Sequence, residues 1–336
     1  MFYLSQLKKE DLAGKTCLLR INLDIKDPKK DSLRIDAIIP TIKFILENNG
    51  RPLILSHRGR PEGIDPKLSL ESLMEIICKK IGLPFDSSQG SQLRWLENLR
   101  FDPREQANDE NFAKELAGKG DIYINDDFAT SHRASVSMVG ITKFLPSYAG
   151  LLLEKEIKNL SKVMENPEKP LVIIIGGIKI DDKVDMIKHF IDIADYFLMG
   201  SKYEISNFKF QISNDLSKKI IFPEDYISEN NQNLDIGPKA IEQYMKIIST
   251  AKTIIWNGPL GLFENPKYLE GSKKIAEAII ASKAFSVIGG GDTDQLLGQL
   301  GIKDGFSFVS TGGGAMLEFL SGKKLPAIEA LDRANI

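Results

Sequence analysis

The feature that most constrains the fold is a series of short apolar runs, each bounded by glycine, proline or aspartate. Runs that are apolar throughout are typical of strands buried on both faces of a parallel sheet. Between them lie helical patterns, such as the apolar residues of 35–46 at spacings of three and four, which Asn48-Asn49-Gly50 closes. This alternation predicts an α/β fold. The predicted strands are residues 17–23, 52–55, 122–124, 171–175, 196–199, 253–256, 285–288 and 306–309.

The length of the chain, 336 residues, predicts two domains. A boundary is expected at Leu145-Pro146-Ser147, and the amphipathic run 151–164 that follows is suited to one helix connecting two lobes. Nine of the ten arginines lie in residues 1–150, whereas 17 of the 27 glycines lie in residues 151–336. Residues 1–150 carry 22 basic and 21 acidic side chains, so net charge does not explain the excess of arginine. The first lobe therefore requires guanidinium groups rather than positive charge alone.

Charge and cysteine usage exclude several classes of protein. The chain has 44 basic and 46 acidic residues, so it has no global field for nucleic acid or for an anionic membrane. Cys17 and Cys78 lie far apart in the sequence and form no Cys-x-x-Cys pair, which indicates a reducing compartment. The first residues reach mixed charge before any apolar region, unlike a signal peptide, and no run is long enough for a membrane helix. We therefore expect a cytoplasmic protein.

Several arginines follow predicted strands, where open α/β sheets bind their ligands. A guanidinium group binds the oxygens of a carboxylate or phosphate in pairs, so this placement indicates an anion site. For any one arginine, a surface ion pair is the simpler explanation, but it becomes weaker for several arginines placed alike. These arginines are Arg20, Arg58, Arg60, Arg100 and Arg133.

In the second lobe, glycine clusters follow three predicted strands and precede helical patterns, at Gly176-Gly177, 289–291 and 312–314. Such turns let backbone N–H groups approach a phosphate, although each one alone is also compatible with a plain tight turn. A helix beginning here would place Lys179 and Lys183 on one face, as phosphate ligands or as solvated lysines. Asp292 is suited either to Mg²⁺ or to capping a helix.

Two common nucleotide-binding motifs are absent from the sequence. Gly14-Lys15-Thr16 imitates the end of a Walker A motif, but Lys9 stands where its first glycine belongs. No Gly-x-Gly-x-x-Gly follows the first strand, which disfavours a simple dinucleotide oxidoreductase.

Taken together, eight segments in order along the chain resemble phosphoglycerate kinases. They are Ser-His-Arg-Gly-Arg-Pro from Ser56, Leu-Glu-Asn-Leu-Arg-Phe from Leu96, Ile-Asn-Asp-Asp-Phe-Ala-Thr-Ser-His-Arg-Ala from Ile124, Gly-Gly-Ile-Lys-Ile-Asp-Asp-Lys from Gly176, Leu-Asp-Ile-Gly-Pro-Lys from Leu234, Trp-Asn-Gly-Pro-Leu-Gly-Leu-Phe-Glu from Trp256, Gly-Gly-Gly-Asp-Thr from Gly289 and Ser-Thr-Gly-Gly-Gly-Ala from Ser310.

The resemblance implies two Rossmann-like lobes with parallel sheets, joined by a hinge helix. The first lobe would be residues 1–148, with 322–336 returning to it, the hinge helix 149–165, and the nucleotide lobe 166–321. The reaction would be 1,3-bisphosphoglycerate + ADP ⇌ 3-phosphoglycerate + ATP with Mg²⁺, a phosphoryl transfer with a carboxyl acceptor in glycolysis and gluconeogenesis. We expect a monomer whose partners are these small molecules, with neither nucleic acid nor membrane among them.

The resemblance also implies residue roles. Phosphoglycerate would be bound by Asn22, Asp24, Arg34, His57, Arg60, Arg100 and Arg133. The nucleotide would be bound by Gly176, Gly177, Lys179, Lys183, Leu234, Asn257, Pro259, Leu262, Glu264, Gly291, Asp292 and Thr293, with Asp292 at the metal. Charge in the transition state would be stabilised by Arg34, Lys179, Lys183 and the helix N-termini at Gly291 and Gly314.

The sequence departs from the family at several places. Where the family has an aspartate, an apolar residue and an asparagine after the first strand, this chain has Asn22-Leu23-Asp24, so the acid and the amide have changed places. Ser135 stands where the family usually has a histidine, and residues 199–202 stand where it usually has a glycine triplet. The chain is also shorter than typical members, mainly between Gly200 and Leu234. One alternative is therefore a relative that binds these ligands without turnover. A solute-binding clamp is a second alternative, disfavoured because glycine turns cluster in one lobe only.

Overall fold

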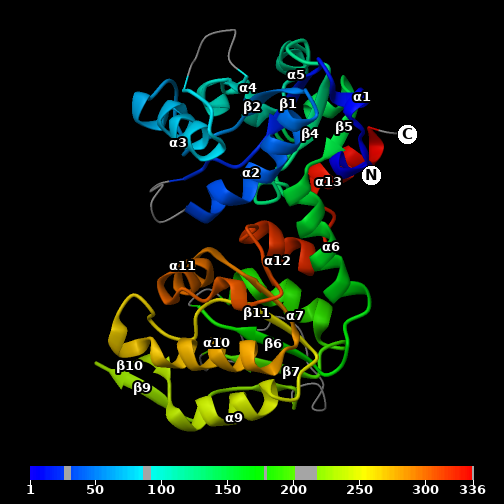
Figure 1. Cartoon of the computed structure of the whole chain (residues 1–336). Coiled ribbons are helices and arrows are strands. Elements are labelled where there is room, and N and C mark those ends of the chain that lie inside the picture. Colours follow the sequence, from blue (N-terminus) through cyan, green and yellow to red (C-terminus); the bar gives the residue numbers. More distant parts are fainter. Residues whose placement is uncertain (26–31, 86–91, 178–179, 201–217, 335–336) are drawn as a thin grey trace. The chain divides into compact units, whose positions relative to one another are not determined.

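The computed structural model describes residues 1–25, 32–85, 92–177, 180–200 and 218–334 (Figure 1). It divides into two compact units, which we describe separately. Unit 1 comprises Met1–Ile157 and Lys324–Ile336, and unit 2 comprises Lys158–Lys323. The division falls inside helix α6 (Leu151–Glu165), at the run predicted to form a connecting helix.

Unit 1 is built on a five-stranded sheet in the order β3-β2-β1-β4-β5, and every pair of neighbours is parallel. The chain reverses its direction of winding between β1 and β4, which places a switch point at the carboxyl edge between them. The strands are β1 (Thr16–Arg20), β2 (Arg51–Leu55), β3 (Arg94–Trp95), β4 (Ile122–Asn125) and β5 (Ser147–Ala149). The helices of this unit are α1 (Lys9–Leu12), α2 (Ser32–Glu47), α3 (Glu71–Ile81), α4 (Arg104–Ala107), α5 (Glu110–Ala117) and α13 (Pro326–Arg333).

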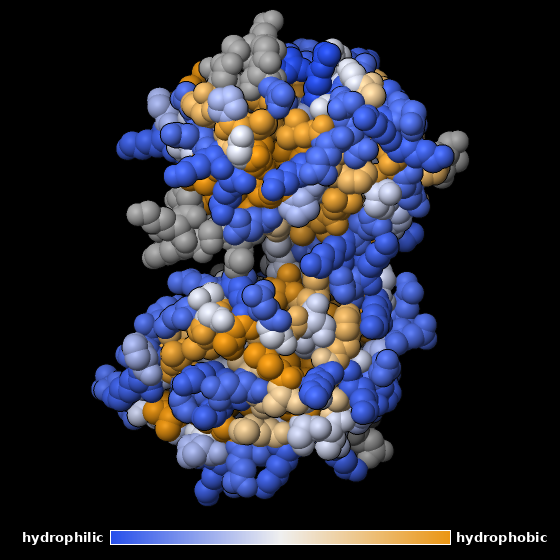
Figure 2. All heavy atoms as spheres, in the orientation of Figure 1, coloured by the Kyte–Doolittle hydropathy of each residue, from blue (hydrophilic) through white to orange (hydrophobic). Residues whose placement is uncertain are grey.

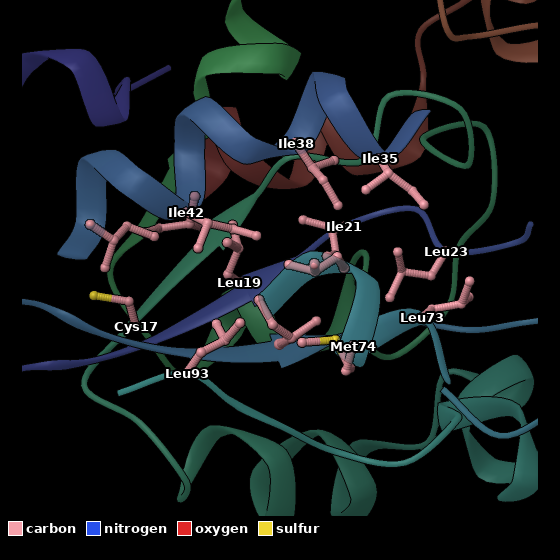
Figure 3. Close-up of a cluster of buried hydrophobic side chains, with 14 of the residues drawn as sticks. Cys17, Leu19, Ile21, Leu23, Ile35, Ile38, Ile42, Leu73, Met74 and Leu93 are labelled. Carbon is pink, nitrogen blue, oxygen red and sulfur yellow. The ribbon is translucent and has the colours of Figure 1, made fainter. Parts of the chain in front are cut away.

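The spacing of isoleucines along α2 explains how this helix packs. Ile35, Ile38 and Ile42 lie on one face of the helix and are fully buried. In Figure 3, Ile42 lies above Leu19 of β1 and Ile38 points toward Ile21, which follows β1, within one apolar cluster. The helix ends at Glu47, immediately before the predicted stop at 48–50, so this prediction is confirmed.

The C-terminal helix α13 lies in unit 1 although it follows all of unit 2 in the sequence. The backbone N–H of Ala327 donates to the carbonyl of Ser131 over 3.1 Å, and the amino terminus of Met1 lies 3.1 Å from a carboxylate oxygen of Asp332. The two ends of the chain therefore meet in the same unit (Figure 1).

Unit 2 is built on a six-stranded parallel sheet in the order β13-β12-β11-β6-β7-β8, with its switch point between β6 and β11. Its strands are β6 (Leu171–Ile175), β7 (Tyr196–Met199), β8 (Ile220–Ile221), β11 (Thr253–Asn257), β12 (Phe285–Gly289) and β13 (Phe308–Val309). A separate antiparallel hairpin is formed by β9 (Tyr226–Glu229) and β10 (Gln232–Ile236). Its helices after α6 are α7 (Val184–Phe190), α9 (Pro238–Ile248), α10 (Glu270–Ser282), α11 (Gly291–Leu300) and α12 (Gly314–Leu320).

The predicted α/β class with parallel sheets is confirmed. The predicted strand bounds 171–175 and 196–199 agree with β6 and β7, but two other predicted runs are too long. The run 17–23 ends as a strand at Arg20, and the run 306–309 is a strand only at Phe308–Val309. Ile21 and Leu23 of the first run are buried after the strand has ended, so their apolar character reflects burial without strand pairing.

The connecting helix α6 begins against a buried carboxyl group. One oxygen of Asp126, which follows β4, accepts the N–H groups of Leu152 and Leu153 over 2.8 and 3.1 Å. This bonding satisfies two of the N–H groups that a helix start leaves open. Burial raises the pKa of Asp126 to about 6, despite the opposing effect of these donors.

The Asp126→Asn protein should gain stability relative to wild type by about 2 kcal/mol as the pH rises from about 4 to about 7. Because the folded-state pKa is raised, the contribution of Asp126 is full below its ordinary pKa and is lost as the pH passes about 6. Asparagine does not ionise and has no such loss. Urea unfolding, followed through Trp95 in a Trp256→Phe background, measures the difference. If the free energies of unfolding of the variant and of wild type differ by the same amount at both pH values, the prediction is contradicted.

On the face of each unit drawn in Figure 2, apolar side chains gather in areas that hydrophilic side chains border. The small net charge of -2 leaves any anion site to local clusters of charge. Within the part of the chain that the structure describes, no helix has the length and apolar character needed to cross a membrane.

Candidate active site

Basic side chains gather at the carboxyl edge of the sheet in unit 1. Arg20 ends β1, His57 follows β2, Arg100 lies in the 3-10 turn Leu99–Phe101 after β3, and Arg133 follows β4. The pKa of His57 lies well below its ordinary value, first because the ring is buried and then because the charges of all three arginines act on it. Sequence positions spread over four loops therefore form one cationic cluster, as parallel strands require.

Arg20 is the buried centre of this cluster. Its side chain is 2% exposed and lies 2.8 Å from a carboxylate oxygen of Asp127, which is fully buried. Its Nε donates to the Ser137 hydroxyl over 3.0 Å, and its Nη2 lies 2.7 Å from His57 Nδ1. The Ser137 hydroxyl in turn donates to buried Glu105 over 2.6 Å. A buried charge paired in this way is costly to disrupt and holds its neighbours in fixed positions.

The loop after β1 borders the cluster with an amide and a carboxylate. Asn22 donates to Asp127 over 3.1 Å. One oxygen of Asp24 accepts the N–H of Gly59 over 2.8 Å, and the other lies 3.9 Å from His57 Nε2. Arg34, from α2, donates to the Asp24 carbonyl over 3.2 Å. The structure thus brings the predicted residues of this loop together with His57.

Three further arginines of the predicted site differ in exposure. Arg100 is buried and donates to the Gly59 carbonyl over 2.7 Å, and its pKa is lowered chiefly by burial and then by the charge of Arg133. Arg60 and Arg133 are exposed. Their guanidinium groups are therefore open to a ligand from solvent, whereas that of Arg20 is bound by Asp127, Ser137 and His57.

In unit 2 the switch point brings two glycine-containing turns into backbone contact. The N–H of Gly176 donates to the Asn257 carbonyl over 3.0 Å, and that of Gly177 donates to the Pro259 carbonyl over 2.7 Å. A Cβ on Gly176 would lie only 2.1 Å from the Pro259 oxygen and 2.3 Å from the Gly258 oxygen. Only glycine fits position 176, because rigid backbone atoms surround it.

Lys183 reaches back to this turn. Its ammonium group donates to the Gly176 carbonyl, and burial lowers its pKa. At Lys183 the structure has no α-helix of the kind considered from sequence, because Asp181–Lys183 is a 3-10 turn and α7 begins at Val184. Lys179 lies outside the described residues.

The glycine clusters after β12 and β13 precede helices, as predicted. Gly291 is the first residue of α11 and Gly314 the first of α12. Asp292 is exposed in the first turn of α11. Thr293 is fully buried, and its hydroxyl accepts the N–H of Gly258 over 2.9 Å. The structure therefore assigns Thr293 a contact with the switch-point turn, beside the amide of Asn257, which donates to the Gly289 carbonyl over 3.0 Å.

The remaining predicted nucleotide residues lie around the end of the hairpin. The N–H of Leu262 donates to the Leu234 carbonyl over 2.8 Å. Leu262 is 42% exposed and Glu264 is exposed, so an apolar side chain and a carboxylate are both open to solvent here. Next to Leu234, Asp235 is buried and accepts the N–H of Gly271 near the start of α10 over 2.8 Å, and burial raises its pKa to about 6.

Three residues around the cationic cluster were missed as site residues by sequence reasoning. Arg20 was recognised only as one of several strand-end arginines, and Asp127 and Ser137 were assigned no role. The usable signal was position: Arg20 ends a strand at the switch point, and Asp127 follows the neighbouring strand β4.

The two units define a class of protein: a two-domain α/β protein with a cationic cluster at the carboxyl edge of one parallel sheet and glycine-containing turns at the switch point of the other. Comparison gives the family. The family model described as phosphoglycerate kinase matches residues 7–211 and 203–323, and the chain belongs to this family.

Relatives named phosphoglycerate kinase match nearly the whole chain. The one from Dictyoglomus turgidum is 35% identical, with 97% of each chain covered, and the one from Thermosipho africanus is 37% identical, with 96% of each covered. Solved phosphoglycerate kinase structures from Coxiella burnetii and Pyrococcus horikoshii align with TM-scores of 0.84 and 0.85 at 30% and 28% identity, covering 99% and 100% of this chain and 99% of each of theirs.

The comparisons agree with the short length noted in the sequence. The alignment with the Dictyoglomus relative spans 387 positions, more than the 336 residues of this chain, so the relative has internal residues without counterparts here. The family model matches in two pieces that overlap at 203–211, inside the stretch 200–234 where the sequence is expected to be shortened.

Proposed function

We propose that the chain catalyses reversible phosphoryl transfer from 1,3-bisphosphoglycerate to ADP, giving 3-phosphoglycerate and ATP. The observation that carries the proposal is the cationic cluster of Arg20, His57, Arg100 and Arg133 at one sheet edge of unit 1. Membership of the phosphoglycerate kinase family supports the same assignment, as do the glycine turns of unit 2. The reaction belongs to glycolysis.

In this mechanism unit 1 binds the phosphoglycerate. The exposed guanidinium groups of Arg60 and Arg133 receive its phosphate, and Arg34 lies nearest the carboxyl group that accepts or releases the phosphoryl group. Phosphoryl transfer needs positioning and charge stabilisation but no covalent nucleophile. The cluster supplies both, because its donors are already oriented by buried partners.

Unit 2 binds the nucleotide. Gly176 and Gly177 offer backbone at the switch point, Leu234 and Leu262 contact the base, and Glu264 binds the ribose. Asn257 and Pro259 support the turn. The phosphates lie toward Lys179, Lys183 and the N–H groups at the starts of α11 and α12, where Gly291 and Gly314 stand. These groups stabilise negative charge that develops during transfer.

The residues present fit Mg²⁺ that arrives with a nucleotide. The described residues contain no cluster of three or more acidic, histidine or cysteine side chains suited to a metal, but Asp292 offers one exposed carboxylate. Mg²⁺ is commonly held by one or two carboxylates together with substrate phosphates and water. Asp292 would hold the ion, with Thr293 beside it, and the ion would neutralise phosphate charge.

The proposal includes three further expectations. Helix α6 is the hinge between the substrate unit and the nucleotide unit, and its movement excludes water, a competing acceptor, during transfer. The enzyme is a monomer. It acts in the cytoplasm, which suits two free, buried cysteines.

Turnover tests the proposal directly. Purified protein with 3-phosphoglycerate and MgATP should produce ADP, followed through a coupled assay. Binding of both ligands without turnover would instead favour the alternative suggested by the exchanged positions of Asn22 and Asp24.

Arg133→Ala should raise the KM for 3-phosphoglycerate by about tenfold or more, since a charge-assisted hydrogen bond contributes about 1.5–3 kcal/mol. The KM for ATP should stay unchanged. The matched control is Arg51→Ala, because Arg51 is also exposed but begins β2, at the opposite edge of the same sheet. Equal effects of the two substitutions on the KM for 3-phosphoglycerate would contradict the assigned site.

A further inference from the structure

Arg20 and His57 are in direct contact inside the cationic cluster. Arg20 Nη2 lies 2.7 Å from His57 Nδ1, and both side chains are buried, at 2% and 3% exposure. The other ring nitrogen, Nε2, faces the carboxylate of Asp24 at 3.9 Å, on the side where the loop after β1 borders the cluster.

The chemistry of guanidinium decides the protonation of the ring. A guanidinium group has only N–H donors and does not deprotonate in proteins. His57 Nδ1 must therefore accept the hydrogen from Arg20 and cannot carry one itself. A neutral imidazole with a bare Nδ1 carries its hydrogen on Nε2, and an imidazolium would place two hydrogens against each other.

Arg20 is itself held too firmly to turn away from the ring. Asp127 pairs with Nη1, Ser137 accepts from Nε, and the carbonyl of Ile21 accepts from Nη1. Ser137 is fixed in turn by Glu105. A guanidinium group whose three nitrogens all have partners keeps one orientation, because turning would leave several buried donors without acceptors.

We propose that Arg20 is a positioning residue that holds His57 as the neutral tautomer with its hydrogen on Nε2, so that this nitrogen donates to the bound anion. The proposal deepens the proposed function, on which the identity of the anion rests. His57 then adds a directed hydrogen bond to the site without adding charge to a cluster that already holds three guanidinium groups.

The surroundings of the ring support this assignment. The charged groups that act on it are Arg20 from β1, Asp24 from the following loop, Arg100 after β3 and Arg133 after β4. Burial and the three cations lower the pKa of His57, and the single carboxylate is 44% exposed and 3.9 Å away. Protonation would bring a fourth cation into this cluster.

Nitrogen-15 NMR of the intact protein tests the proposal, because only three histidines are present. A His57→Asn protein identifies the His57 signals. In wild type we expect the spectrum of an Nε2–H imidazole that does not titrate from about pH 5.5 to about pH 8. A hydrogen on Nδ1, or an ordinary titration, would overturn the proposal.

The Arg20→Lys protein provides the second test. A single ammonium group does not reproduce the planar guanidinium group, so His57 Nδ1 should no longer be fixed as an acceptor and the ring should exchange between its two neutral tautomers. Burial and the charges of Arg100 and Arg133 remain in this variant and should still keep the pKa of His57 below its ordinary value. The KM for 3-phosphoglycerate should rise about tenfold, with the KM for ATP unchanged. Arg104→Lys is the control, since Arg104 also lies in unit 1 and also pairs with carboxylates, but its partners are Asp102 and Glu115 at the surface. If Arg20→Lys does not fold, the wild-type spectrum alone decides.

The two proposals fail in different ways. An Nε2–H imidazole in a protein without turnover would refute the proposed function and leave the role of Arg20 intact. Normal turnover with a hydrogen on Nδ1 would refute the role of Arg20 alone.

Discussion

Replacing Asp127 by alanine should lower the free energy of unfolding by about 3–5 kcal/mol, the usual effect of removing one partner of a buried ion pair. Asp127 and Arg20 lie 2.8 Å apart with side chains 0% and 2% exposed, so water does not reach the guanidinium group when the carboxylate is removed. Urea unfolding at neutral pH, followed through Trp95 in the Trp256→Phe background, measures the loss in unit 1.

The matched control is Glu115→Ala. Glu115 pairs with Arg104 at the same 2.8 Å distance, but these side chains are 54% and 41% exposed. Because water and salt screen an exposed pair, the control should lose less than about 1 kcal/mol. The double replacement Arg20→Met with Asp127→Ala should be more stable than Asp127→Ala alone, since it removes the guanidinium charge that Asp127→Ala leaves buried without its partner. Similar losses in Asp127→Ala and Glu115→Ala would refute the role assigned to burial.

The central strands could be predicted from sequence because burial on both faces leaves no polar residue to interrupt them. Residues 171–175 show this pattern, and the strand has these bounds. The edge strands β3, β5 and β8 have only two or three residues each, too few to show any periodicity, and none was predicted. The hairpin β9–β10 was also missed, since its residues are mostly exposed.

The candidate site could be predicted as a set of residues but not as an arrangement. The excess of arginine in the first lobe indicated an anion site, and position after strands selected the right loops. Sequence could not show that Arg20 turns inward while Arg60 remains exposed, because that depends on Asp127, which pairing of β1 with β4 brings alongside. Nor could spacing show that Lys183 precedes α7 and that its ammonium group bonds the carbonyl of Gly176.

Gly176→Ala should have the largest effect in unit 2, lowering kcat/KM for MgATP about 100-fold, the order of loss that a displacement of about 1 Å produces at a reacting group. The added Cβ would lie 2.1 Å from the Pro259 oxygen and 2.3 Å from the Gly258 oxygen, closer than such atoms approach. These neighbours are backbone, so β6 and the turn after β11 must separate, which breaks the bonds from Gly176 and Gly177 to that turn.

The same separation should cost about 3 kcal/mol of folding stability, the upper end for overpacked sites. Gly298→Ala is the control: it lies inside α11, and its added Cβ would meet only the end of the Lys303 side chain, at 3.3 Å, which can move away. That change should stay within about 1 kcal/mol and favour the helix, as alanine does over glycine. Steady-state kinetics of both variants measures kcat/KM for MgATP, and urea unfolding measures their folding stability. A Gly176→Ala protein with normal kcat/KM for MgATP would show that the switch-point turn does not position the nucleotide.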